Sequence, residues 1–180
     1  MIEYIDEIHT YLYNGVIIPS VSQVLREKVF PNKYDGVPKW ILEKKAVYGS
    51  EVHSLIEKIE AGEIVEVSST YVNEGIKQYG KLKKENNFKV LEQEQIVCYE
   101  GLYAGRFDMI FEMDGKKCLC DIKTTAELDK KYLAWQLSMY ELAYGEAFDK
   151  FYCIWLPKGG LGKLVEIERI EKEKILEIVR

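Results

Sequence analysis

Residues Gly105–Thr125 read GRFDMIFEMDGKKCLCDIKTT, and this stretch predicts a β-hairpin. The dipeptide Asp-Gly at positions 114–115 stands at its centre. Both central residues of a type I′ turn need positive φ, which Asp-Gly favours. With the turn there, the alternation of side chains along the two strands places Asp108 directly opposite Asp121, and Lys123 follows two residues later on the same face.

One face of this hairpin is apolar, and the other carries the acids. The apolar side chains that alternate along both strands, typical of a sheet face that packs on a core, are Phe107, Met109, Phe111, Met113, Cys118, Cys120 and Ile122. On the other face, two carboxylates with Cβ atoms roughly 5 Å apart repel each other. A divalent cation would offset this repulsion, and Mg²⁺ and Mn²⁺ take oxygen ligands of this kind.

The alternative interpretation is a solvated, charged sheet face, which antiparallel sheets commonly have. An acid-x-Lys triplet occurs four times in the chain, so the triplet alone does not distinguish a metal site from a charged surface. Only the triplet at Asp121 lies in a predicted strand with a second acid opposite it. That arrangement is compatible with a metal site, and on the residues alone both interpretations stay open.

The whole chain has 180 residues, of which 47% are hydrophobic and 31% are charged. These values indicate one globular domain over 1–180, with an N-terminal hairpin and short helix in 1–38 and a core in 39–180. The net charge of −5 gives no overall attraction to nucleic acid, but a local basic groove is compatible with it. No signal peptide or membrane-spanning segment is recognisable, so we expect a cytoplasmic protein with no membrane partner. The four cysteines lack C-x-x-C spacing and are expected to be reduced core residues.

Helices and strands alternate along the rest of the chain. A hairpin around 14–15 is expected before a helix capped at Ser20 or Ser22. Further helices are expected at 39–61, 69–85, 127–144 and 171–179, with strands at 88–99, 151–156 and 163–170. Thr124 and Glu127 form a capping-box pattern before the helix at 127–144. This order predicts a mixed α/β or α+β fold.

Four short motifs follow one another along these elements. Gly49 and His53 lie four residues apart on one predicted helix, and Gly49 indicates a close approach by another group, since glycine costs a helix about 1 kcal/mol relative to alanine. The motifs that follow are Gly105-Arg106-Phe107-Asp108, then Asp121-Ile122-Lys123, then Gln136 with Tyr140. In this order they resemble the PD-(D/E)xK nuclease superfamily, and more narrowly its RecB-like and phage-type exonuclease branch.

That branch shows a G-x-x-x-H helix, a G-x-x-D strand, an acid-x-K strand and a Q-x-x-x-Y helix. The stretch 19–22, PSVS, is similar to a P-S-V-T stretch near the start of many phage-type members. The proline of the superfamily name is missing here, because Phe107 precedes Asp108. The resemblance implies a restriction-endonuclease-like core, with a central mixed sheet of about four to five strands flanked by helices.

The resemblance also implies a set of metal ligands and a cofactor. Asp108 and Asp121 would hold Mg²⁺ or Mn²⁺, joined by His53 and by the backbone carbonyl of Ile122. Lys123 would be the active-site lysine beside the ion.

Three further positions match the family less closely or act around the metal. Gln136 and Tyr140 match a helix motif that helps to shape the site and to engage the DNA strand. Glu94 matches the acid that other branches use in place of the histidine.

The function implied by the resemblance is that of a metal-dependent deoxyribonuclease, an exonuclease that hydrolyses DNA phosphodiester bonds in recombination or repair. A phage or prophage origin and a single-strand annealing recombinase as candidate partner follow from the same resemblance. The alternative is a catalytically inactive module of the same fold that binds DNA or a recombination partner.

Overall fold

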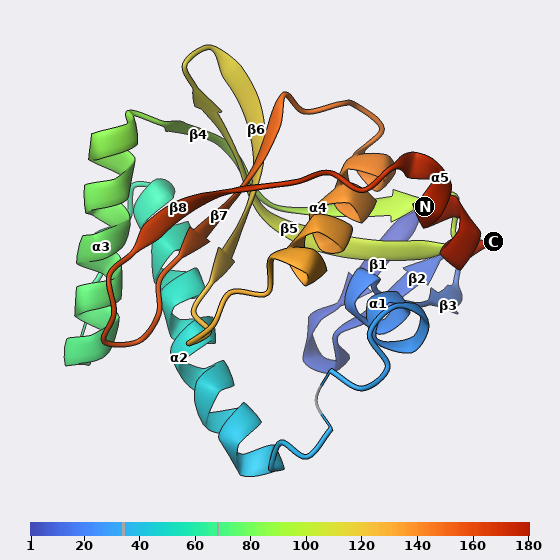
Figure 1. Ribbon diagram of the computed structural model, residues 1–180, viewed down its shortest axis with the longest axis horizontal. Helices are drawn as coiled ribbons and strands as arrows, with labels where there is room; N and C mark the ends of the chain where they lie inside the picture. The colour runs from blue at the N-terminus through green and yellow to red at the C-terminus, as the bar shows by residue number, and fades with distance from the viewer. Residues whose placement is uncertain (34, 68) are drawn as a thin grey trace.

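The computed structural model of the chain describes residues 1–33, 35–67 and 69–180, without the side chains of residues 44 and 45. Its centre is a five-stranded sheet in the order β4-β5-β6-β7-β8 (Figure 1). The strands are β4 (Lys89–Tyr99), β5 (Tyr103–Met113), β6 (Lys116–Lys123), β7 (Lys150–Trp155) and β8 (Lys163–Ile167). Neighbouring strands are antiparallel except β6 and β7, which are parallel. The predicted mixed sheet flanked by helices is confirmed.

Helices cover both faces of this sheet, and Figure 1 shows α2 and α3 on one side with α4 and α5 on the other. One face packs on α1 (Val21–Lys28), α4 (Lys130–Tyr144) and α5 (Lys172–Val179); the other packs on α2 (Lys39–Glu60) and α3 (Thr70–Asn86). Ile110 and Leu119 of the sheet are fully buried on the α4 side. The alternative of a solvated charged sheet face is therefore wrong, because α4 covers it.

The central hairpin has the predicted register. Asp114 and Gly115 have φ values of 52° and 71°, as a type I′ turn requires. Pairing runs from Met113 opposite Lys116 to Met109 opposite Cys120. The predicted register is therefore confirmed. It was predictable because a two-residue turn at a known position determines which residues of the two strands pair.

The predicted position of Phe107 is wrong. Its ring packs in the α4 cluster, edge-on to Tyr144, whereas Met109 and Phe111 pack in the α2 and α3 cluster. The partner strand β4 has a register shift between Val90 and Glu92, and it has left-handed backbone at residue 94. Irregularities of this kind bend and twist a strand pair, so strict alternation fails beyond them.

The predicted start of the helix at 127–144 is also wrong. α4 begins at Lys130, and the side chain of Asp129 caps it by accepting the Tyr132 N–H at 2.9 Å. The predicted capping residue Thr124 lies outside the helix, and the Thr125 hydroxyl instead bonds the Glu127 carbonyl within the loop. An aspartate directly before the helical residues satisfies the first free N–H groups, so it ends the loop there.

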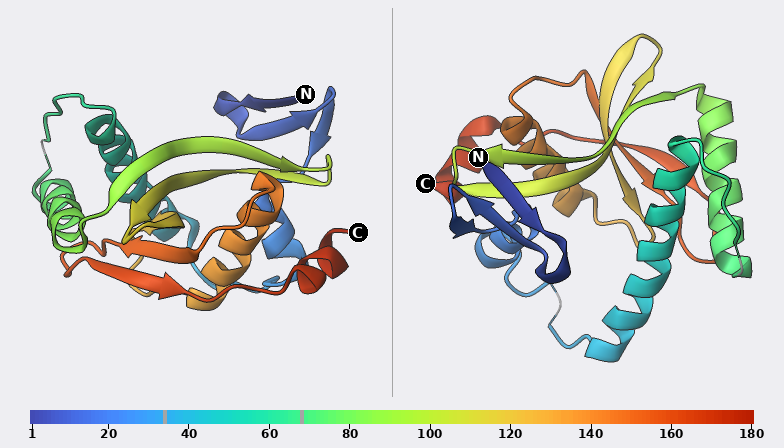
Figure 2. Two further views of the ribbon diagram at one scale, coloured as in Figure 1. Left: turned by 90° about the horizontal axis from the view of Figure 1, so that it is seen from above. Right: turned by 180° about the vertical axis from the view of Figure 1, so that it is seen from behind.

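A second sheet of three strands lies at the N-terminus, formed by β1 (Ile2–Ile5), β2 (Thr10–Tyr13) and β3 (Val16–Ile18). A short 3₁₀ turn, Asp6–Ile8, joins β1 to β2. The predicted hairpin around 14–15 is confirmed, and β1 adds a strand to it. Figure 2 shows this sheet lying against the end of β4 and β5 at which the turn joins these two strands. There the amide of Ala104 donates to the carbonyl of Pro19 at 3.0 Å. The following helix α1 has the predicted cap at Ser20, as a full capping box with Gln23.

None of the helices in the described part of the chain is long and apolar enough to cross a bilayer. The cysteines are free thiols; three are buried and Cys98 is partly buried, as predicted.

Candidate metal centre

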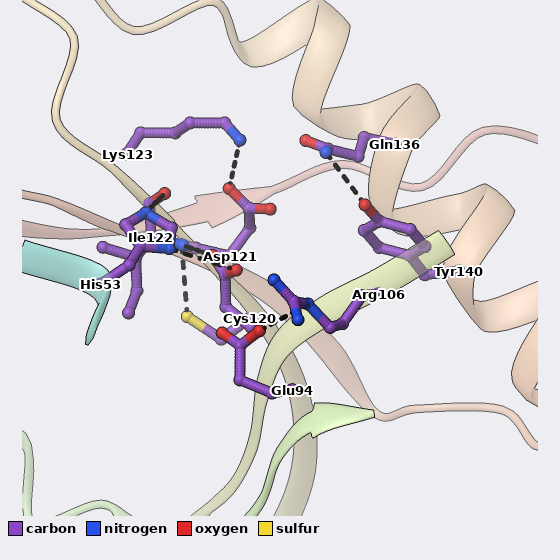
Figure 3. Close-up of polar contacts among 10 residues, drawn as sticks. His53, Glu94, Arg106, Cys120, Asp121, Ile122, Lys123, Gln136 and Tyr140 are labelled. Atoms are coloured by element: carbon purple, nitrogen blue, oxygen red, sulfur yellow. Dashed lines mark hydrogen bonds and ion pairs between the residues drawn. The ribbon is translucent and has the colours of Figure 1, made fainter. Parts of the chain in front are cut away.

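Most of the predicted site residues gather in one region, where Figure 3 shows His53 and Glu94 near the Lys123–Asp121 pair and the Gln136–Tyr140 pair. His53 comes from α2, Glu94 from β4 and Asp108 from β5. Each of these three offers one ligand atom, and the three atoms lie within 4.8 Å of one another. Side chains far apart in sequence therefore converge at metal-binding distances.

Asp108 is fixed in place by both of its carboxylate oxygens. Oδ2 accepts the backbone N–H of Ile122 at 2.6 Å, and Oδ1 lies 3.4 Å from Nδ1 of His53. The β5–β6 ladder ends one residue earlier, at the pair Met109 and Cys120. The carboxylate thus takes up an amide just beyond the end of the ladder, and this bond orients it toward α2.

His53 is held between Asp108 and the next strand. Its Nε2–H donates to the Ile122 carbonyl at 2.9 Å, which leaves Nδ1 facing Asp108. Burial lowers the pKa of His53, but the charge of Asp108 and its hydrogen bond outweigh burial and raise this pKa to about 9. A hydrogen bond from the far ring nitrogen to a carbonyl is the usual way to orient a metal-binding imidazole.

The Ile122 carbonyl, predicted to bind the metal directly, here accepts this hydrogen bond. A carbonyl oxygen has a second lone pair, so the predicted ligand role stays a prediction alongside the orienting role.

Asp121, predicted from the sequence as the second metal-holding acid, lies outside this group of three and instead forms an ion pair with the partly buried Lys123. The Lys123 Nζ lies 2.6 Å from Oδ2 of Asp121, and Asp121 is only 3% exposed. Burial raises the pKa of Asp121 to about 6, although Lys123 opposes this effect. Burial also acts to lower the pKa of Lys123, but the nearby acids prevail and raise it above its ordinary value. Lys123 therefore keeps its charge in the folded protein.

Glu94 is one of the three candidate metal ligands in the structure, whereas the sequence indicated it only as a match to the acid that other branches use. Its backbone has φ of 51° in the middle of a strand, a strained conformation for a residue with a side chain. Its carboxylate lies 2.8 Å from Nε of Arg106. Burial, followed by the charge of Asp108, raises the pKa of Glu94 to about 7. The sequence carries no signal for this contact, because it depends on the irregular pairing of β4 with β5.

The two glycines of the motifs are explained by packing. A Cβ atom on Gly49 would lie 2.9 Å from Oγ1 of Thr124, and one on Gly105 would lie 2.5 Å from Cε1 of Tyr140. Real Cβ atoms do not approach heavy atoms this closely. The glycines thus let α2 and α4 close on the ends of β6 and β5, and the close approach predicted at Gly49 is made by a threonine.

Gln136 and Tyr140 lie on one face of α4, as their spacing predicts, and Gln136 Nε2 donates to the Tyr140 hydroxyl at 3.2 Å. Both are more than nine-tenths buried. Within the described part of the chain, Gln136 Oε1 has no hydrogen-bond partner. Tyr140 lines a cleft of about 410 Å³ with His53, Glu94 and Asp108, and Gln136 lines a cavity of about 750 Å³ with Lys123. Ser22 lines both spaces, so they adjoin each other.

The donor set fits a divalent cation. Carboxylates are the preferred ligands of Mg²⁺, and an imidazole beside them suits Mn²⁺ better. Glu94 and Asp108 share one cleft, and their mutual repulsion acts against ionisation of Glu94. A bound cation would remove that repulsion.

Several solved structures are similar to this chain, among them an alkaline exonuclease and SSO0001. No protein-family model matches the chain, and no curated protein sequence matches it. An alkaline exonuclease, LHK-Exo from Laribacter hongkongensis, is 14% identical over 89% of this chain and 81% of its own, with a TM-score of 0.47. SSO0001 is 19% identical over 76% of this chain and 66% of its own, with a TM-score of 0.36. The assignment of the site rests on its geometry and not on these likenesses.

Proposed function

We propose that this chain is a metal-dependent deoxyribonuclease of the PD-(D/E)xK type. The observation that carries the proposal is the convergence of His53, Glu94 and Asp108 within 4.8 Å, beside the ion pair of buried Asp121 with partly buried Lys123. The motif order in the sequence and the mixed sheet support the same conclusion. Phosphodiester hydrolysis needs a nucleophilic water and stabilisation of negative charge at phosphorus, and this set of residues can provide both.

In this proposal, Nδ1 of His53 and the carboxylates of Asp108 and Glu94 hold Mg²⁺ or Mn²⁺. Asp121 completes the acidic pair predicted from the sequence, and the Ile122 carbonyl orients His53 or adds a ligand. When bound, the ion lowers the pKa of a coordinated water and neutralises phosphate oxygens.

Lys123 acts as a fixed positive charge. The acids around it hold its pKa above the ordinary value, so it does not remove a proton from water at neutral pH. Its Nζ lies at the edge of the cavity that Gln136 also lines. From there the ammonium group can stabilise the charge that develops on the scissile phosphate.

Exonuclease rather than endonuclease action is part of this proposal because the motifs resemble the exonuclease branch. Tyr4 and Tyr11 of the N-terminal sheet line the cleft together with His53 and Asp108. The role in recombination or repair, with a single-strand annealing recombinase as candidate partner, rests on the motif resemblance alone.

The test compares two matched substitutions in the same hairpin. The parent, Asp108→Asn and Asp114→Asn proteins are incubated with end-labelled single-stranded and double-stranded DNA, with Mg²⁺, Mn²⁺ or EDTA. Asp114 lies in the exposed turn, and asparagine tolerates its left-handed backbone. We expect metal-dependent cutting by the parent and by Asp114→Asn, and none by Asp108→Asn.

The order in which DNA products appear distinguishes an exonuclease from an endonuclease, and the absence of products with retained binding indicates an inactive module. Loss of the terminal nucleotide first supports an exonuclease, and early internal fragments support an endonuclease. DNA that stays intact under every condition but is bound supports the inactive binding module and refutes the enzyme.

A further inference from the structure

Lys123 begins a row of side chains that crosses the sheet. In the sheet register Lys123 pairs with Trp155 of β7, and Trp155 pairs with Lys163 of β8. Directly paired residues point to the same face of a sheet. Adjacent strands lie about 4.8 Å apart, so the row covers roughly 10 Å from β6 to the edge strand.

The row lies on the same face of the sheet as Asp121, the acid beside the cluster of His53, Glu94 and Asp108. Asp121 is two residues before Lys123, so the two share a face. Cys153 and Val165 pair in register with Asp121, and they pack in the cluster of α4. The row therefore stands on the α4 side, at the end of the sheet where the parallel strands β6 and β7 both finish (Figure 1).

Trp155 is the middle residue of this row, and a hydrogen bond fixes its side chain. Its indole N–H donates to the Thr125 carbonyl at 2.7 Å. Thr125 and Lys123 both line the 750 Å³ cavity that contains Gln136. The tryptophan thus joins the rim of that cavity to the sheet edge.

Lys163 ends the row with an exposed positive charge. Its Nζ lies 5.7 Å from the centre of the Trp155 ring. Among the residues that the structure describes it has no ion pair, whereas Lys123 is paired with Asp121. On a chain of net charge −5, binding of a polyanion needs such local cations.

We propose that the row Lys123–Trp155–Lys163 is a contact track for single-stranded DNA leading away from the proposed catalytic cleft. Cations separated by an aromatic ring suit a single strand, because the lysines attract phosphates while the ring packs on a sugar or base. The track rests on the proposed nuclease function and adds a substrate-binding surface outside the metal centre. Lys163 binds DNA without touching the reacting atoms.

The test measures binding of a fluorescein-labelled single-stranded oligonucleotide by anisotropy, in EDTA so that the DNA is not cut. The parent is compared with Lys163→Gln and with Lys158→Gln as the matched control. Lys158 is also exposed and lies 4.6 Å from the Tyr71 ring centre, but on the side of α2 and α3. Thermal unfolding of each variant checks that the fold is retained.

We expect Lys163→Gln to weaken binding about 3-fold to 10-fold and to reduce the slope of log affinity against log salt by about 0.7, the value for one phosphate contact on a single strand. Lys158→Gln is expected to bind like the parent. Equal affinity and salt slope for the parent and Lys163→Gln would overturn the track while leaving the nuclease proposal standing. A parent that neither binds nor cuts DNA would overturn both proposals.

Discussion

The charge on His53 leads to a prediction about the metal-free protein. The nearby Asp108 raises the pKa of this histidine to about 9, from 6.5 for an ordinary side chain. A group whose pKa is higher in the folded state stabilises the fold fully below its unfolded pKa, and the contribution is lost as pH rises through its folded pKa. The His53 contribution is therefore present at pH 6 and largely lost at pH 9.5.

The difference between about 9 and 6.5 corresponds to roughly 3 kcal/mol of unfolding free energy. The His53 side chain is 30% exposed, so solvent screens part of its attraction to Asp108. We therefore expect a loss of about 1–2 kcal/mol from this residue over the pH range. Replacing His53 with asparagine should remove that loss.

The measurement is urea denaturation of the parent and of His53→Asn in EDTA, at pH 6 and at pH 9.5. Acids such as Glu94 and Asp121 also titrate in part of this range, and comparing the two proteins removes what they contribute in common. We expect the parent to lose about 1–2 kcal/mol more than His53→Asn between the two pH values. Equal losses in both proteins would show that Asp108 does not hold a proton on His53, and the electrostatic account of the site would be wrong.

Three further outcomes are expected. Gly105→Ala places a Cβ atom 2.5 Å from the Tyr140 ring, so it should lower the unfolding free energy by about 1–3 kcal/mol in urea denaturation; unchanged stability would refute the packing account. Mn²⁺ at 100 times its Kd should stabilise the parent by about 2.7 kcal/mol and leave Asp108→Asn unchanged, as measured by thermal shift; equal shifts in both would place the ion elsewhere. Lys123→Met should reduce kcat roughly 100-fold or more while calorimetry shows Mn²⁺ still bound, and a normal kcat would remove Lys123 from the mechanism.

Much of the site was predictable because its motifs lie in elements defined by local rules. Asp-Gly at 114–115 fixes the hairpin, and the register places Asp108 and Asp121 on neighbouring strands. The helical spacing of apolar residues predicted α2, and with it the approximate position of His53. Turn chemistry and side-chain periodicity act over a few residues, so the sequence alone expresses them.

Tertiary structure decided what depends on contacts between distant segments. The left-handed Glu94 joins His53 and Asp108 only because β4 pairs irregularly with β5, and that irregularity also moves Phe107 into the α4 cluster. The row from Lys123 to Lys163 exists only because β6 lies between β5 and β7, with β8 beyond. Strand order and strand twist are set by how the whole core packs, and no short stretch of sequence carries that information.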